Sequence, residues 1–150
     1  MRRPTLKALT LVFSLLGIAD SWYLAQHELT DTALSCGIGG SATLSGCNIV
    51  AQSPYSHLFG IPLGVYGLVF YGIALLITLA LYAGETRRRL QALLAIGIIG
   101  VLFSLYFEGL QVFVIKAICI YCLGSFLLSV GILATSLALM RRPAETPPLM

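Results

Sequence analysis

Three long stretches of the chain contain no charged residue, and this feature limits the possible folds more than any other. No Asp, Glu, Lys or Arg occurs in residues 32–84, 90–107 or 117–140. A helix needs about 20 mostly apolar residues to cross a bilayer, so stretches of this kind are typical of membrane-spanning helices. Their apolar residues are continuous rather than alternating, which excludes a membrane β-barrel.

The composition leads to the same conclusion. Of the 150 residues, 58% are hydrophobic and 10% are charged, whereas soluble domains average about 25% charged residues. The net charge of +3 is too small and too scattered to indicate nucleic-acid binding. We therefore predict an all-α integral membrane protein, with residues 1–150 forming one four-helix bundle. The predicted spans are residues 9–26, 61–83, 90–110 and 116–140.

The positions of Lys and Arg predict the topology, because positive charges mark the cytoplasmic side. Basic residues fall at three places, namely Arg2, Arg3 and Lys7 before the first span, Arg87, Arg88 and Arg89 between the second and third, and Arg141 and Arg142 after the fourth. The segment 28–60 has none, and the connection between the third and fourth spans has only Lys116. Both termini are thus expected in the cytoplasm and the segment 28–60 outside.

Both ends of the chain and the outer segment need separate interpretation. Residues 1–19 also resemble a signal peptide, although Asp20 and Trp22 suit a cleavage site poorly; the outer segment stays outside in either case. From residue 32 onward that segment carries no charge, which favours a loop or short helix that caps the bundle over an ordinary solvated loop. The Pro-rich tail, residues 143–150, is expected to be disordered.

The four cysteines form two pairs, and the predicted topology brings all of them to the outer face. Cys36 and Cys47 lie in the outer segment, while Cys119 and Cys122 form a Cys-x-x-Cys motif at the start of the fourth span. An extracytoplasmic compartment permits disulfides. Sulfur chemistry at the outer membrane surface is therefore the first functional hypothesis.

The spacing of the second pair indicates a reactive dithiol. Helix residues three apart share a face, and the helix N-terminus favours a negative charge. Such cysteines can be thiolates near neutral pH, and the thiolate is the nucleophile in disulfide exchange. Lys116, one turn before Cys119, is expected to add to this stabilisation. At the bilayer edge, a dithiol of this kind is within reach of a lipid-soluble oxidant.

Two other uses of the cysteines compete with a redox role. Two static disulfides remain an alternative, although the start of a helix is a poor place for a structural Cys-x-x-Cys. A zinc site needs closely spaced cysteine pairs, and the interval from Cys36 to Cys47 is too wide, with no matching spacing at His27 or His57. We therefore expect no metal. A relay is favoured, in which the outer pair exchanges with an external protein and the motif passes two electrons to a quinone.

The order of these elements resembles the vitamin K epoxide reductase family. The resemblance runs from about residue 9 to residue 140 and includes four spans, an outer cysteine pair and a Cys-x-x-Cys that opens the last span. It is carried by Asp20-Ser21-Trp22-Tyr23-Leu24, by Cys47 with Ser53-Pro54-Tyr55, by Phe59-Gly60-Ile61-Pro62-Leu63-Gly64, and by the approach from Ser104 to Cys119.

The resemblance implies a role for each cysteine. Cys122 would face the quinone, forming a transient adduct or a charge-transfer contact with it. Cys119 would be its disulfide partner and would also exchange with Cys47. Cys36 would receive electrons from a periplasmic thioredoxin-fold (DsbA-like) carrier. Ser53 would match a serine on the short helix that caps the quinone pocket.

Further candidates for the quinone pocket are aromatic. Phe59, Tyr106, Phe107 and Phe126 could line a flat, ring-binding site, and equally they could serve packing or an interfacial belt. An ionisable residue inside a membrane is a functional suspect, so Asp20 is a candidate proton relay, and a capping role at the membrane interface is the alternative. Phe126 stands where animal members of the family have tyrosine, and quinone reduction is therefore expected rather than epoxide reduction.

The predicted function is that of a membrane thiol:quinone oxidoreductase that supports disulfide formation. Its expected location is a bacterial inner membrane, with ubiquinone or menaquinone as electron acceptor and a periplasmic thiol carrier as partner. Two alternatives stay open. One is an unrelated four-span quinone-linked oxidase, which would carry its Cys-x-x-Cys in the first outer loop. The other is a non-catalytic membrane scaffold with structural disulfides.

Overall fold

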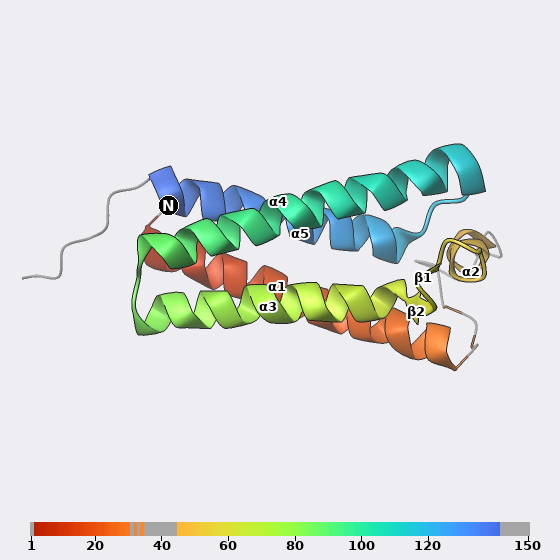
Figure 1. Cartoon of the computed structure of the whole chain (residues 1–150), viewed down its shortest axis with the longest axis horizontal. Helices are drawn as coiled ribbons and strands as arrows, with labels where there is room; N and C mark the ends of the chain where they lie inside the picture. Colours follow the sequence, from red (N-terminus) through yellow and green to blue (C-terminus); the bar gives the residue numbers. More distant parts are fainter. Residues whose placement is uncertain (1, 31, 33, 35–44, 142–150) are drawn as a thin grey trace, which may run out of the picture.

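Four long helices lie side by side in the computed structural model, which describes residues 2–30, 32, 34 and 45–141 (Figure 1). The elements are α1 (Arg3–Leu29), α2 (Ser45–Ala51), β1 (His57–Leu58), β2 (Ile61–Pro62), α3 (Leu63–Ala83), α4 (Arg87–Leu110), the π-helical segment η1 (Gln111–Ile115) and α5 (Ile120–Arg141). The helices α1, α3, α4 with η1, and α5 are each long and apolar enough to cross a membrane. The predicted all-α membrane bundle is confirmed.

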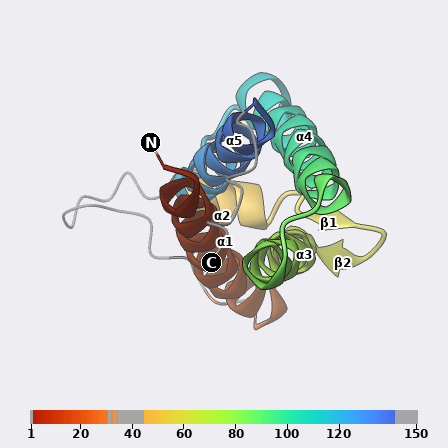
Figure 2. The same cartoon turned by 90° about the vertical axis from the view of Figure 1, so that its left-hand side faces the viewer.

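The helices occupy the corners of a four-sided bundle. The helix α1 packs against α3 and α5, and α4 packs against the same two helices. The end-on view shows α1 and α4 diagonally opposite each other (Figure 2). Side chains from α1 and α4 that point inward therefore face one another across the interior.

Small residues bring the helices together, as expected where lipid supplies no hydrophobic drive for helix association. A Cβ atom at Gly64 would collide with the backbone of Ala25, so α3 lies directly on α1. Gly17 likewise leaves room for the ring of Tyr71. The Tyr71 hydroxyl then reaches α5, where it donates a hydrogen bond to the Ser125 carbonyl at 2.7 Å. This buried tyrosine ties α1, α3 and α5 together at mid-bundle.

The helix bounds differ from the predicted spans mainly around the last connection. The third span continues through η1 to Ile115, and α5 starts at Ile120 rather than at residue 116. Lys116 explains the difference, because its φ of 55° is left-handed and ends the helix. Non-glycine residues rarely adopt that conformation. The first helix is also longer than predicted, since polar residues at both of its ends continue the same helix.

One end of the bundle carries most of the described basic residues. The starts of α1 and α4 and the end of α5 meet there (Figure 1). Glu85 pairs with Arg3 and with Lys7, the latter at 2.7 Å. Arg89 donates a hydrogen bond to the Ala80 carbonyl at 2.7 Å. The described basic residues that were predicted to share one side of the membrane therefore lie at one end of the bundle.

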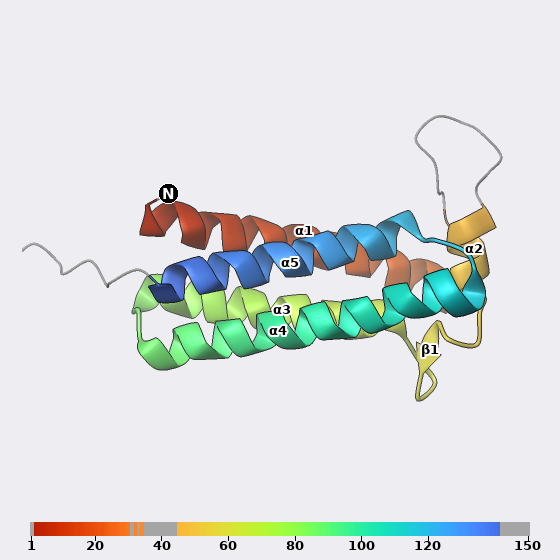
Figure 3. The ribbon, with the colours of Figure 1, turned by 90° about the horizontal axis from the view of Figure 1, so that it is seen from above.

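The opposite end carries α2 and the hairpin of β1 and β2 (Figure 3). The short helix α2 lies over the bundle end, as expected for a cap. It is followed by a hairpin in which His57 pairs with Pro62 and Leu58 with Ile61. Residues 35–44 and 142–150, which include part of the predicted outer loop and the predicted disordered tail, lie outside the described residues.

Candidate active site

The Cys-x-x-Cys motif sits where a chain turn meets the start of α5. Cys119 directly precedes the helix, and its carbonyl accepts the first-turn hydrogen bond from the Leu123 N–H at 3.0 Å. Cys122 lies in the first turn. Cys119 is buried and Cys122 is half-buried, and both carry free thiols. The predicted position of the motif at the start of the last helix agrees with this geometry.

Gln111 holds the turn that leads to the motif. Its backbone carbonyl accepts a hydrogen bond from the Lys116 N–H, which closes η1, and another from the Ala117 N–H at 3.1 Å. Its side-chain Oε1 accepts a further hydrogen bond from the Cys119 N–H at 2.8 Å. The same side chain also hydrogen-bonds Cys122. Gln111 is 2% exposed, so one buried amide fixes the backbone at Cys119 and touches the second sulfur.

The electrostatic surroundings favour a thiolate at Cys119. Its pKa is lowered, mainly because the Cys122 thiol donates a hydrogen bond to the Cys119 sulfur. Burial opposes this change, whereas the backbone N–H groups of Cys122 and Tyr121 add to it. Lys116 is exposed and is not among the groups that shift this pKa. The expected help from Lys116 is therefore not seen, because the left-handed turn places it outside the site.

Cys47 on α2 belongs to the same buried cluster as Cys119. Both pack with Leu34 and Val50, and a small cavity of about 40 Å³ is lined by Cys47, Cys119 and Cys122 together. Cys47 is 2% exposed and is disulfide-bonded. Cys36 lies outside the described residues. Three of the four predicted redox cysteines thus meet at one end of the bundle.

Two contacts fix α2 above the motif. The Asn48 side chain accepts a hydrogen bond from the Leu34 N–H at 2.8 Å, which ties the chain before α2 to the helix. A Cβ atom at Gly46 would collide with the Ile118 carbonyl, so glycine allows α2 to approach the turn before Cys119. The position of Cys47 over the motif is therefore built into the local packing.

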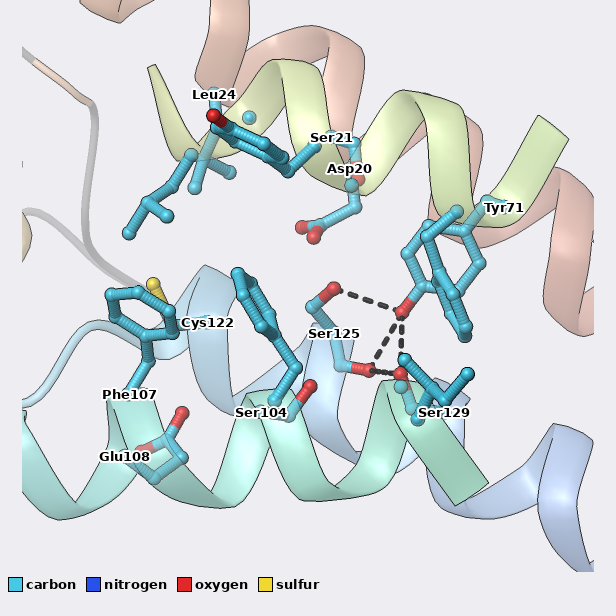
Figure 4. Close-up of a pocket in the computed structure, with 18 residues that line it drawn as sticks. Asp20, Ser21, Leu24, Tyr71, Ser104, Phe107, Glu108, Cys122, Ser125 and Ser129 are labelled. Carbon is cyan, nitrogen blue, oxygen red and sulfur yellow. Dashed lines mark hydrogen bonds between the residues drawn. The ribbon is translucent and has the colours of Figure 1, made fainter. Parts of the chain in front are cut away.

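A larger cavity of about 280 Å³ extends from Cys122 into the interior of the bundle (Figure 4). Its apolar walls come mainly from α3 and α4, with Leu24 from α1, and include the aromatic rings of Tyr66, Phe70, Phe103 and Phe107. Its polar groups come from all four helices and include Asp20, Tyr71, Ser104, Glu108, Ser125 and Ser129. Apolar walls with a few convergent polar groups are typical of small-molecule sites. Cys122 lines both cavities.

Three of the six predicted pocket residues line a cavity, and the other three do not. Asp20 and Phe107 line the large cavity, and Ser53 lines the small one, where its hydroxyl donates a hydrogen bond to the Val50 carbonyl. Phe126 lines neither cavity. Neither do Phe59, 92% exposed at the hairpin tip, and Tyr106, 63% exposed on the outside of α4.

Two site residues were missed by reasoning from sequence. Gln111 is the polar residue in the otherwise apolar run of residues 109–115, and that interruption was the available signal. Glu108, close to the end of the third predicted span, also lines the large cavity. Among the described residues, no three His, Cys, Asp or Glu side chains gather as a metal site requires.

Comparison with known proteins agrees with this arrangement. The model of the vitamin K epoxide reductase family matches residues 8–137. The chain belongs to this family. Within it, a thiol-disulfide oxidoreductase, LTO1 of Arabidopsis thaliana, is 35% identical over 66 residues, which cover 44% of this chain and 16% of that relative. The chain thus corresponds to a small part of that longer protein. The family match includes α1, α3, α4 and the Cys-x-x-Cys motif.

Proposed function

We propose that this member of the vitamin K epoxide reductase family is a thiol:quinone oxidoreductase. The observation that carries the proposal is the position of Cys122, which lines both the small cavity with Cys47 and the large cavity inside the bundle. A dithiol with one sulfur toward another cysteine and one toward an apolar chamber can accept electrons on one side and release them on the other. The alternative of a scaffold with fixed disulfides is not favoured, because Cys119 and Cys122 are free thiols.

The proposed electron path runs from the outer pair to the motif. A reduced thioredoxin-fold carrier gives up two thiol hydrogens and becomes a disulfide, while the Cys36–Cys47 disulfide becomes a dithiol. Cys47 then attacks the Cys119–Cys122 disulfide at Cys119, forming a mixed disulfide and releasing the Cys122 thiolate. Cys36 resolves this bond and restores its own disulfide. The shared burial of Cys47 and Cys119 supports this order.

In the second half-reaction the motif reduces the quinone. Cys119 and Cys122 form a disulfide, and the quinone takes up two electrons and two protons to become a quinol. We place the quinone ring in the large cavity, beside Cys122 and Phe107. A volume of about 280 Å³ is slightly below that of cavities for drug-sized ligands, so it suits a ring-sized head group. Asp20, which lines the same cavity, is the proposed proton relay.

The proposed orientation has the basic bundle end in the cytoplasm and the cysteines outside. The distribution of Lys and Arg supports it, and an extracytoplasmic disulfide system coupled to quinone is the setting in which a relay of this kind works. The proposed location is a bacterial inner membrane, where the carrier is periplasmic and the acceptor is ubiquinone or menaquinone. A membrane-impermeant maleimide tests the orientation with single cysteines introduced as Thr86→Cys or Tyr55→Cys. In intact cells the cysteine at residue 55 should react, and the cysteine at residue 86 should not.

Replacement of Cys122 tests the function. The purified protein, reduced by dithiothreitol, should reduce decylubiquinone, and Cys122→Ser should abolish the reaction because the sulfur that faces the cavity is lost. A thiolate–quinone absorption band that vanishes in the same variant would support the assignment. The matched control is Ser136→Ala, which removes a hydroxyl from α5 at a position that lines neither cavity. Quinone reduction at the normal rate by Cys122→Ser would reject the proposed role of Cys122.

A further inference from the structure

A second carboxyl group, that of Glu108, lines the large cavity. Its Oε1 atom is buried and has no hydrogen-bond partner among the described residues. A buried carboxyl oxygen without a partner is costly, and ionisable groups inside membrane bundles usually have a function. None of the described residues that line the cavity is Lys or Arg. Glu108 therefore has no cation to neutralise it there, and the structure gives it no packing role that requires a carboxyl group.

Glu108 and Asp20 lie on opposite sides of this cavity. Asp20 belongs to α1 and Glu108 to α4, the two helices that are diagonal in the bundle (Figure 2). Figure 4 shows the Asp20 carboxyl group on the side of α1 and α3, and Glu108 beneath Phe107 on α4. Glu108 is also close enough to Cys122 to interact with it electrostatically. One acid is thus near the reactive sulfur, and the other is across the chamber.

This arrangement suits a ligand that must gain two protons at two separated atoms. Anionic ligands are disfavoured, because the cavity offers two carboxyl groups and no basic side chain. A neutral molecule with an acceptor oxygen at each end of a flat ring matches both the acids and the aromatic walls. The remaining titratable groups that line the chamber are Tyr66 and Tyr71 from α3 and Cys122 from α5. The Tyr71 hydroxyl is already engaged with Ser125 and Ser129.

We propose that Glu108 is a catalytic proton carrier between the Cys122 thiol and the nearer carbonyl oxygen of the quinone. This inference rests on the proposed function. As the Cys119–Cys122 bond forms, the Cys119 thiolate and the Cys122 thiol give two electrons to the quinone and release one proton. Glu108 accepts this proton from Cys122 and transfers it to the nearer oxygen, and Asp20 supplies the proton at the far oxygen. Asp20 regains a proton from water, which took up the proton that Cys119 lost when its thiolate formed, so atoms and charge balance with a quinol as product.

A single-turnover experiment separates this step from the exchange among cysteines. Protein reduced with dithiothreitol and then freed of it is mixed with decylubiquinone, and the quinone absorbance is followed. Glu108→Gln should slow the reaction about 100-fold, the lower end of what general acid–base catalysis contributes. Glu108→Asp should retain more activity than Glu108→Gln because it keeps an acid. Tyr106→Phe is the control, since Tyr106 is on the same helix but lines neither cavity.

Chemical rescue by formate distinguishes a catalytic role of Glu108 from a purely structural one. It also shows whether a variant with low activity is still folded. Glu108→Ala should regain quinone reduction when formate is added, because a small acid can occupy the vacated space, and its Cys47–Cys119 exchange should proceed at the normal rate. Wild-type protein that fails to reduce decylubiquinone would reject the proposed function itself. If the wild-type protein does react, two results would reject the role of Glu108 alone. One is a rate of quinone reduction in Glu108→Gln within about twofold of the wild-type rate, and the other is a Glu108→Ala variant that formate does not rescue.

Discussion

The backbone N–H of Cys119 donates a hydrogen bond to the side-chain Oε1 of Gln111 at 2.8 Å, across eight residues and a helix break. This bond joins the end of the third membrane span to the start of the fourth. It satisfies a buried donor just ahead of α5, where no preceding helical turn exists to accept it. The same side chain contacts Cys122. The position of both sulfurs therefore depends on one residue outside the cysteine motif.

Replacement of Gln111 should loosen the motif. Gln111→Leu keeps the volume but leaves the Cys119 N–H without an acceptor, which is expected to cost about 1–3 kcal/mol. Thermal unfolding of the purified protein in detergent measures this loss. Val112→Ala, at an exposed neighbouring position, is the matched control and should stay within about 0.5 kcal/mol. Equal stability of Gln111→Leu and wild type would show that the bond is unimportant.

The thiolate of Cys119 should form at a lower pH than an ordinary cysteine thiolate. Its pKa is lowered chiefly by the hydrogen bond from the Cys122 thiol, and a lowered pKa means that the charged form persists as the pH falls. Cys122→Ala removes this donor, so the titration of Cys119 should move to higher pH. Ultraviolet absorbance of the thiolate, with a variant lacking both Cys119 and Cys122 as blank, follows the titration. A shift toward lower pH would contradict the assigned cause.

A mixed disulfide between Cys47 and Cys119 should accumulate when Cys122 is replaced. The two residues lie in one buried cluster, and Cys122 is the sulfur that competes with Cys47 for a disulfide bond to Cys119. Cys122→Ser is expected to trap the Cys47–Cys119 bond, which mass spectrometry of peptides from protein alkylated under non-reducing conditions will detect. Cys119→Ser is the comparison. Trapping of Cys47 on Cys122 to the same extent in Cys119→Ser would reverse the assigned order of the two sulfurs.

The junction of α1, α3 and α5 should tolerate no side chain at Gly17. A methyl group there would overlap the ring of Tyr71, whose hydroxyl is held by Ser125. Overpacking of this kind typically costs about 1–3 kcal/mol, so Gly17→Ala should lower the melting temperature. Gly72→Ala is the control, because nothing lies within 4 Å of a Cβ atom at that position. A loss in Gly72→Ala as large as that in Gly17→Ala, or no loss in Gly17→Ala, would show that contact with Tyr71 does not decide the outcome.

The sequence was sufficient to predict the bundle and the meeting of the cysteines. Long charge-free runs need a bilayer or a large core, and positive charges at alternate connections bring the same ends of the helices together. From those two facts it follows that Cys47, Cys119 and Cys122 share one end of the molecule. These properties depend only on residue type and spacing along the chain, so they can be predicted from the sequence without knowing any tertiary contact.

The lining of the cavities was decided by tertiary structure. Phe59, Tyr106 and Phe126 are aromatic residues near the cysteines in sequence, yet they line neither cavity, whereas Glu108 and Gln111 do. In a membrane helix an apolar side chain is similarly stable when it faces lipid or protein, so composition does not reveal its direction. Helix rotation, the left-handed turn at Lys116 and the close approach of α2 at Gly46 determine that direction. The turn is held by Gln111 only a few residues away, whereas the approach of α2 results from packing between segments that are distant in the chain.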